Sequence, residues 1–149
     1  ADVKATSPEP GKVDVRVLLV GGALPEKEML DTVAGILSAD NVRPLTDYVT
    51  VHAPETVEYD IDVTYYTQEG GALSDEVISE NVAAAVQKFK TWQAERMGRD
   101  VNPSYLIQLL MEAGVKRVEV RSPAFTTVAD NAVAQIGETS IVNGGAESE

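Results

Sequence analysis

The chain has 149 residues, no cysteine, and 24 acidic against 12 basic residues, which give a formal net charge of −12 at pH 7. The acidic balance argues against binding of nucleic acid or an anionic membrane surface, because both favour positively charged proteins. The absence of cysteine excludes disulfides, thiol catalysis and zinc–thiolate sites, and the apolar runs of the sequence are too short to span a bilayer.

The chain opens with a lead-in and a strand. Residues 1–12 are rich in Pro, Ser and Gly and predict an extended segment. The run KVDVRVLLV (12–20) alternates hydrophobic and polar residues, a pattern typical of a half-buried strand. Gly21 and Gly22 are expected to end it in a turn.

A helix and a second strand follow. Apolar residues recur at helical spacing over 25–39, with Pro25 in the first turn, where a missing N–H is tolerated. The side chains expected to face inward are Leu30, Val33, Ala34 and Leu37. A short alternating strand over 48–53 then stops at Pro54.

The longest alternation in the chain is VEYDIDVTYYT (57–67), a strand expected to end before Gly70 and Gly71. Ser74 is a predicted N-cap for a long helix reaching about Met97. The predicted inward stripe of this helix consists of Ile78, Val82, Ala85, Val86, Phe89 and Trp92.

The remaining elements are a short helix and two strands. Gly98 is expected to close the long helix, and Asn102 and Pro103 to open a second helix that Gly114 ends. A strand over 115–122 is followed by a loop and a final strand over 133–142. The inward side chains are expected to be Leu106, Leu109, Leu110 and Ala113 on the helix, and Val118 and Val120 on the strand.

This order predicts an α+β fold with two small ferredoxin-like lobes, β-α-β and then β-α-α-β-β, whose helices pack on mixed or antiparallel sheets. The predicted divisions are a lead-in over 1–12, a first lobe over 13–54, a second lobe over 55–143, and a disordered acidic tail over 144–149.

Few residues suggest chemistry. His52 has no second histidine to form a metal site or a triad, so we interpret it as a surface residue. Glu58, Asp60 and Asp62 lie on one strand face, where residues two apart are separated by roughly 6–7 Å, which is wide for one compact cation site. No histidine or lysine base accompanies the candidate nucleophiles Ser74, Ser79 and Ser104.

Two other features favour structural roles. The pairs Gly21-Gly22 and Gly70-Gly71 do not match phosphate-binding patterns and read as turns. Phe89 and Trp92 share the helical spacing of their apolar neighbours and are expected in the core. The residues therefore predict no catalytic machinery.

Four segments carry a family resemblance: SPEPGKVDVRVLLVGGALPEKEML, ADNVRPLTDYVTVHAPETVEYDIDVTYY, MGRDVNPSYLIQLLMEAGVKRVEV and SIVNGGAESE. In this order they resemble baseplate J-like proteins of contractile-tailed phages and related injection machines. The resemblance covers about Ser7 to Gly145. Family members usually carry a further N-terminal portion, so a chain that begins at Ala1 is expected to be a C-terminal fragment.

The resemblance implies a structural wedge protein of the virion tail baseplate, assembled in the bacterial host cytoplasm and without enzymatic activity, cofactor or metal. Its implied partners are other baseplate wedge and tail proteins, with copies of itself as a further option, and the isolated fragment is expected to be able to remain monomeric. The residues that match the family's motifs are Arg43, Pro44, Leu45, Thr46, Asp47, Gly98, Arg99, Asp100, Ser104, Gly114 and Val115.

Two hypotheses describe the motif over 43–47. In the first, Pro44 ends the preceding helix and Arg43 pairs with Asp47 across a corner between helix and strand. In the second, Arg43 lies on the surface and pairs with an acidic patch of a neighbouring subunit.

Two other function classes remain open from the sequence. A small-molecule-binding regulatory α+β module would show an apolar pocket with converging polar groups between the lobes. A tail-associated hydrolase would need paired carboxylates in a cleft.

Overall fold

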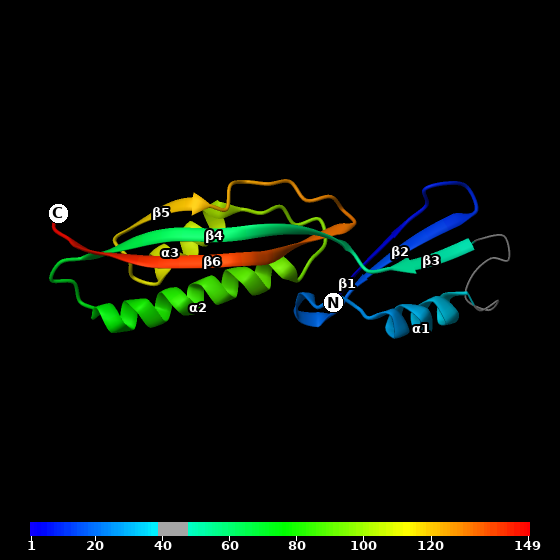
Figure 1. Ribbon diagram of the computed structural model, residues 1–149, viewed down its shortest axis with the longest axis horizontal. Coiled ribbons are helices and arrows are strands. Elements are labelled where there is room, and N and C mark those ends of the chain that lie inside the picture. Colours follow the sequence, from blue (N-terminus) through cyan, green and yellow to red (C-terminus); the bar gives the residue numbers. More distant parts are fainter. Residues whose placement is uncertain (39–47) are drawn as a thin grey trace.

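A computed structural model describes residues 1–38 and 48–149, with the backbone alone at residue 48, and shows an elongated molecule with two lobes end to end (Figure 1). The described residues form two three-stranded mixed sheets and three α-helices, which confirms the α+β class. In chain order the elements are β1 Asp2–Thr6, β2 Lys12–Leu18, the 3₁₀-helix η1 Val20–Gly22, α1 Lys27–Leu37, β3 Tyr48–His52, β4 Glu55–Gln68, α2 Asp75–Ala94, α3 Pro103–Glu112, β5 Arg117–Ser122 and β6 Ala132–Glu147.

The first lobe is the sheet β1-β2-β3 with α1. β1 is antiparallel to β2, and β2 is parallel to β3. The lead-in predicted over 1–12 therefore contains a strand, because the alternating residues 2–6 pair with β2 in a register that places Val3 opposite Val17.

Helix α1 is shorter than the predicted helix over 25–39. Glu26 has extended backbone angles and serves as the N-cap, so the helix begins at Lys27 rather than in the turn of Pro25. The four side chains predicted to face inward are only half-buried, and α1 contains no buried residue.

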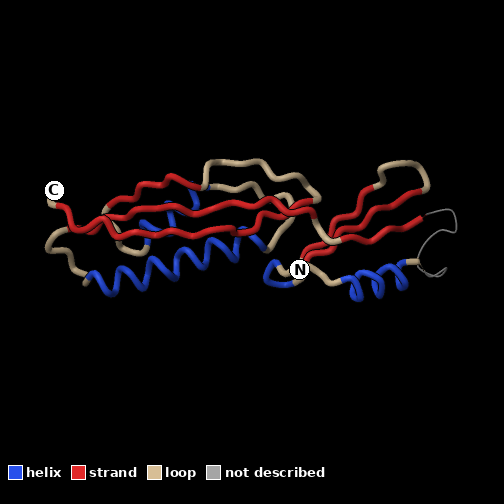
Figure 2. The backbone as a smooth tube through the Cα atoms, in the orientation of Figure 1, coloured by secondary structure: helices blue, strands red, loops and turns tan. Residues whose placement is uncertain are grey.

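The second lobe is the sheet β5-β4-β6 with α2 and α3 on one face. β4 is antiparallel to β5 and parallel to β6. The three strands lie side by side along the lobe (Figure 2). The strand alternation of β4 was predicted correctly, since Tyr59, Ile61, Val63 and Tyr65 are buried. The predicted helix stripe is also confirmed from Ile78 to Phe89, and Trp92 packs on this core as a half-buried residue.

The predicted helix starts in the second lobe are confirmed by hydrogen bonds. The Ser74 hydroxyl accepts from the backbone N–H of Val77 at 3.3 Å, and the Asn102 side chain accepts from the backbone N–H of Ser104 at 3.1 Å. Helix α2 ends at Ala94 rather than near Met97, so Gly98 does not cap it.

The C-terminal segment differs from the prediction. We expected the last strand to end at 142 and the tail over 144–149 to be disordered. In the structure β6 continues to Glu147, with Ala146 opposite Thr67 and Glu147 opposite Gln68 of β4. The segment is ordered because it forms backbone hydrogen bonds with the long central strand. Its polar, glycine-containing sequence alone does not indicate a strand.

A small junction joins the lobes. Leu18, Met97 and Val133 form a buried cluster separate from the main core, and the Asp2 carboxylate accepts from the backbone N–H of Met97 at 3.0 Å. The ferredoxin-like label for the two lobes is not confirmed, because each described sheet has only three strands of mixed direction. In the described residues no helix is both long and apolar enough to cross a membrane.

Candidate functional site

The first group of motif residues, Arg43 to Asp47, lies outside the described residues. Both hypotheses for this segment, a structural corner or a subunit contact, therefore stay predictions. The second group, Gly98 to Ser104, lies where α2, α3 and the start of β6 meet.

Gly98 fixes the chain between α2 and β6. Its backbone N–H donates to the carbonyl of Ala132 at 2.9 Å, and its φ is +73°. A Cβ at this position would lie 3.1 Å from the Asp130 carboxylate oxygen Oδ1. A glycine is therefore suited to this position by both its backbone conformation and its close neighbour.

Arg99 closes the C-terminal end of α2. Its Nη1 donates to the Trp92 carbonyl and to Glu95 Oε1, the latter at 3.2 Å. The guanidinium carbon stacks 4.3 Å from the centre of the Trp92 ring, which in turn packs edge-on to Tyr105. Arg99 thus satisfies a carbonyl that the helix end leaves without an intrahelical partner and adds a cation–π contact.

Replacing Arg99 with alanine is expected to lower the free energy of unfolding by about 1–3 kcal/mol, because a charge-assisted hydrogen bond and the stacking on Trp92 are lost. Urea unfolding followed by circular dichroism measures the change. Arg96→Ala is the matched control, since Arg96 is exposed, and should change stability by no more than about 0.5 kcal/mol. Equal effects from the two variants would contradict the capping role.

Asp100 and Gln93 hold the loop between α2 and α3. Asp100 Oδ1 accepts from the backbone N–H of Val128 at 2.8 Å. The amide of Gln93, which is completely buried, donates to the carbonyls of Arg99 at 2.9 Å and Asp100 at 3.1 Å. Sequence reasoning missed Gln93. Its position four residues after Phe89, on the apolar stripe, is the signal that could have identified it.

The remaining motif residues belong to α3 and its end. Ser104 is in the first turn and donates its backbone N–H to Asn102. Gly114 has a φ of +104° and follows the helix end as predicted, and Val115 is buried. The motif from Gly98 to Val115 therefore supports a rigid helix–loop–helix edge, and its residues do not converge on a reactive centre.

Two arginines of β5 cross the open face of the second sheet. Arg121 makes two hydrogen bonds to the Asp62 carboxylate of β4, at 2.8 and 3.0 Å. Arg117 reaches over the ring of Tyr66, 3.8 Å from its centre, and binds Glu147 of β6 at 2.6 and 2.9 Å. These contacts tie all three strands together on the face away from the helices.

The arginines also change the acidity of their partners. Hydrogen bonding by Arg121 lowers the pKa of Asp62, and hydrogen bonding by Arg117 lowers the pKa of Glu147. The same contacts raise the pKa of each arginine. Asp62 therefore stays ionised and is unsuited to act as a general acid.

The lowered pKa values predict acid sensitivity of this face. A carboxylate with a lowered folded-state pKa contributes stability above its unfolded pKa, about 3.8 for Asp62, which is lost as the pH falls through the folded value. Arg121→Gln is expected to return the Asp62 pKa toward 3.8, as measured by carboxyl-carbon NMR titration. Lys88→Gln on α2 is the control. An unchanged Asp62 titration in Arg121→Gln would contradict the pairing.

The other residues considered for chemistry in the sequence make ordinary contacts at the surface. His52 Nε2 lies 3.2 Å from Asp14, with the histidine side chain half exposed. Asp60 accepts from the backbone N–H of Glu138 at 2.8 Å. Groups of three or more potential metal-ligating side chains are absent from the described residues. Burial raises the pKa of Tyr59 to about 12, so its hydroxyl stays protonated at neutral pH.

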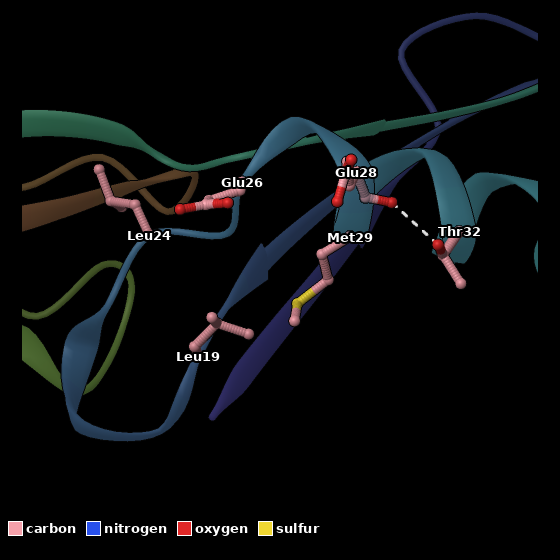
Figure 3. Close-up of a pocket in the computed structure, with 6 residues that line it drawn as sticks. All are labelled: Leu19, Leu24, Glu26, Glu28, Met29 and Thr32. Carbon is pink, nitrogen blue, oxygen red and sulfur yellow. Dashed lines mark hydrogen bonds between the residues drawn. The ribbon is translucent and has the colours of Figure 1, made fainter.

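Two hollows are relevant to the two other function classes, a small-molecule-binding module and a hydrolase. A cleft of about 370 Å³ lies between the lobes and is lined by Lys4, Ala5, Thr6, Asp14, Arg16, Asp130 and Asn131. Arg16 already contacts Asp14 and donates to the carbonyl of Ala53 at 2.9 Å, so its charge serves the junction. A larger open groove of about 550 Å³ lies in the first lobe beside α1 (Figure 3).

Comparison with known proteins identifies both halves of the chain. Residues 1–53 match the baseplate J-like central domain, and residues 59–142 match the baseplate J-like protein C-terminal domain. Baseplate protein J of Escherichia phage P2 is 34% identical over 152 residues, covering 99% of this chain and 48% of that protein. This chain therefore spans about half the length of that relative.

A solved structure shares the fold. A chain in the cryo-EM structure of the anti-feeding prophage baseplate matches with a TM-score of 0.56 and 15% identity, over 84% of this chain and 29% of that one. The second domain match alone, residues 59–142, covers more than half of the chain. The chain belongs to the baseplate J-like protein family.

Proposed function

We propose that this chain is part of a structural wedge protein in the baseplate of a contractile phage-type tail, where it works through protein–protein contacts. The observation that carries the proposal is the ordered match of two baseplate J-like domains, over residues 1–53 and 59–142. The P2 relative is a baseplate protein by name, and the structural match comes from a baseplate assembly.

The arrangement of these residues supports a structural role rather than a catalytic one. The central strand β4 runs through the second lobe between β5 and β6. The Arg121–Asp62 pair fastens β5 to β4, and the Arg117–Glu147 pair joins β5 to β6 across it. The motif residues Gly98 to Asp100 anchor the end of α2 to β6 and to the loop before it. We infer that the residues of the family motif stiffen the second lobe. A stiff lobe can then support contacts with neighbouring proteins.

The proposed partners are other wedge and tail proteins of the same particle, and copies of this protein are a further option. The proposed location is the tail baseplate of a phage or prophage particle. We also propose that the predicted lobes over 13–54 and 55–143, extended by β1 and by the end of β6, act as two units joined at the Leu18–Met97–Val133 cluster.

Deletion of the gene from a strain that produces the particle tests this function. The expected result is loss of contractile tails with complete baseplates in negative-stain electron micrographs, restored by the wild-type gene supplied in trans. Complete, contracting tails in the deletion strain would overturn the proposal. As a control, a gene for a protein of unrelated fold is supplied in trans in the same way. This gene should not restore complete tails.

A further inference from the structure

The first lobe leaves much of its apolar surface uncovered. In its described residues, prolines apart, the buried hydrophobic side chains are Val15 and Leu18. Val3 of β1 is 59% exposed, and Met29 and Ile36 of α1 are 43% and 60% exposed. The second lobe, in contrast, has one continuous core under α2 and α3. A small lobe that exposes several large apolar side chains favours contact with another surface.

One of these side chains, Met29, lines a groove beside α1. Its apolar lining is Leu19 directly after β2, Leu24 on the connection to α1, and Met29 of α1. Figure 3 shows Met29 extending from the helix toward Leu19, with Leu24 on the segment that leads into Glu26. The hollow of about 550 Å³ could receive one or two large side chains.

The rim of the groove is acidic. Glu26 and Glu28 line it, together with Thr32, whose hydroxyl donates to the Glu28 backbone carbonyl at 2.9 Å. Within the described part of the chain neither carboxylate makes a hydrogen bond or an ion pair. Lys27 lies between them in sequence but does not line the groove. With respect to the described residues, both carboxylates are free to pair with cations of a partner.

The charge of the chain indicates which kind of partner fits the groove. A second copy would carry the same net charge of −12 to an acidic rim, and like charges placed together at an interface disfavour association. A segment with an apolar anchor flanked by Lys or Arg satisfies both parts of the groove, because its apolar side chain is buried while its cations face the carboxylates.

We propose that this groove is a docking site for a basic segment of a different baseplate protein, which inserts an apolar side chain among Leu19, Leu24 and Met29 and pairs with Glu26 and Glu28. The inference rests on the proposed function for the nature of the partner. The recognition chemistry itself depends only on the groove.

Binding of short capped peptides to the full 149-residue chain tests the proposal. The peptides share one apolar centre and differ only in flanking Lys, Glu or Gln residues, and methyl NMR signals of Leu19, Leu24 and Met29 report binding. The Lys-flanked peptide is expected to bind about tenfold more tightly than the Glu-flanked one, since two partly exposed charge pairs replace two repulsions.

Charge reversal provides the decisive comparison. Glu26→Lys/Glu28→Lys should reverse the preference in favour of the Glu-flanked peptide. Glu76→Lys/Glu80→Lys is the matched control, because it makes the same charge change at exposed positions early in α2 and should leave the preference unchanged. For the apolar part, Met29→Gln should weaken binding about tenfold, whereas Ile36→Gln, exposed on the same helix outside the groove, should not.

Equal binding of the Lys-flanked and Glu-flanked peptides would overturn the proposal, and so would an equal effect of the two charge-reversal variants. Tightest binding of the Gln-flanked peptide would indicate a neutral apolar occupant instead. Concentration-dependent self-association through the same methyl signals would indicate a second copy. None of these outcomes requires a baseplate, so failure here is separable from failure of the deletion experiment.

Discussion

Replacing Phe89 with alanine is expected to lower the free energy of unfolding by about 3–5 kcal/mol, the range for deleting a buried aromatic side chain. Phe89 is completely buried in α2, where its ring packs edge-on to Tyr59 at a centre distance of 6.0 Å and tilted against Trp92 and Tyr105. For a chain of this length the loss corresponds to a melting temperature lower by about 6–20 °C.

Thermal unfolding followed by circular dichroism measures this effect. Val77→Ala on the same helix is the control, because Val77 is 41% exposed, and its change should stay within about 0.5 kcal/mol. A loss below about 1 kcal/mol in Phe89→Ala would mean that the core of the second lobe does not pack as described.

Replacing Gly22 with alanine is expected to destabilise the protein by about 2–5 kcal/mol. Its φ of +80° costs an L-residue about 1–2 kcal/mol. A Cβ would also lie 2.3 Å from the Ala94 carbonyl oxygen at the end of α2, so the two lobes would have to separate locally. Overpacking of this kind adds about 1–3 kcal/mol.

The neighbouring glycine separates the two contributions. Gly21 has nearly the same φ, +78°, but a Cβ there would meet nothing within 4 Å. Gly21→Ala should therefore show only the backbone cost of about 1–2 kcal/mol in urea unfolding. If the two variants lose the same stability, the close approach of η1 to α2 does not exist in solution.

The strongest periodicities gave the most reliable fold predictions. The alternation of β4 and the helix stripe from Ile78 to Phe89 both describe buried faces, and hydrophobic period is set by burial. The starts of α2 and α3 were also predictable, because Ser74 and Asn102 satisfy nearby backbone groups in a way that local sequence encodes.

The errors arise where long-range contacts override local signals. β1 forms in the proline-rich lead-in only because β2 offers a pairing edge. β6 continues through Gly144 and Gly145 because β4 lies beside it, and a Cβ at Gly144 would collide with the Tyr66 ring. Helix α2 ends early where Arg99 caps it and Asp2 binds the N–H of Met97.

The candidate site was only partly accessible from sequence. Arg99 and Asp100 were selected through the family resemblance, whereas their bonds to Trp92, Glu95 and Val128 depend on how the loop folds. The pairs of Arg117 with Glu147 and Arg121 with Asp62 require the register of the sheet, with partners 30 and 59 residues apart. The groove beside α1 could not be predicted, because it depends on how the connection that carries Leu19 and Leu24 folds against α1.

The proposed function makes this chain a structural part of a contractile-tail baseplate. Cryo-electron microscopy of tails purified from the producing strain can locate the chain in the assembled particle. The expected result is density at the baseplate, repeated by the symmetry of the tail, that fits both three-stranded sheets with α2 and α3 over the second. A baseplate resolved to side-chain detail in which every chain is assigned to other proteins would contradict it.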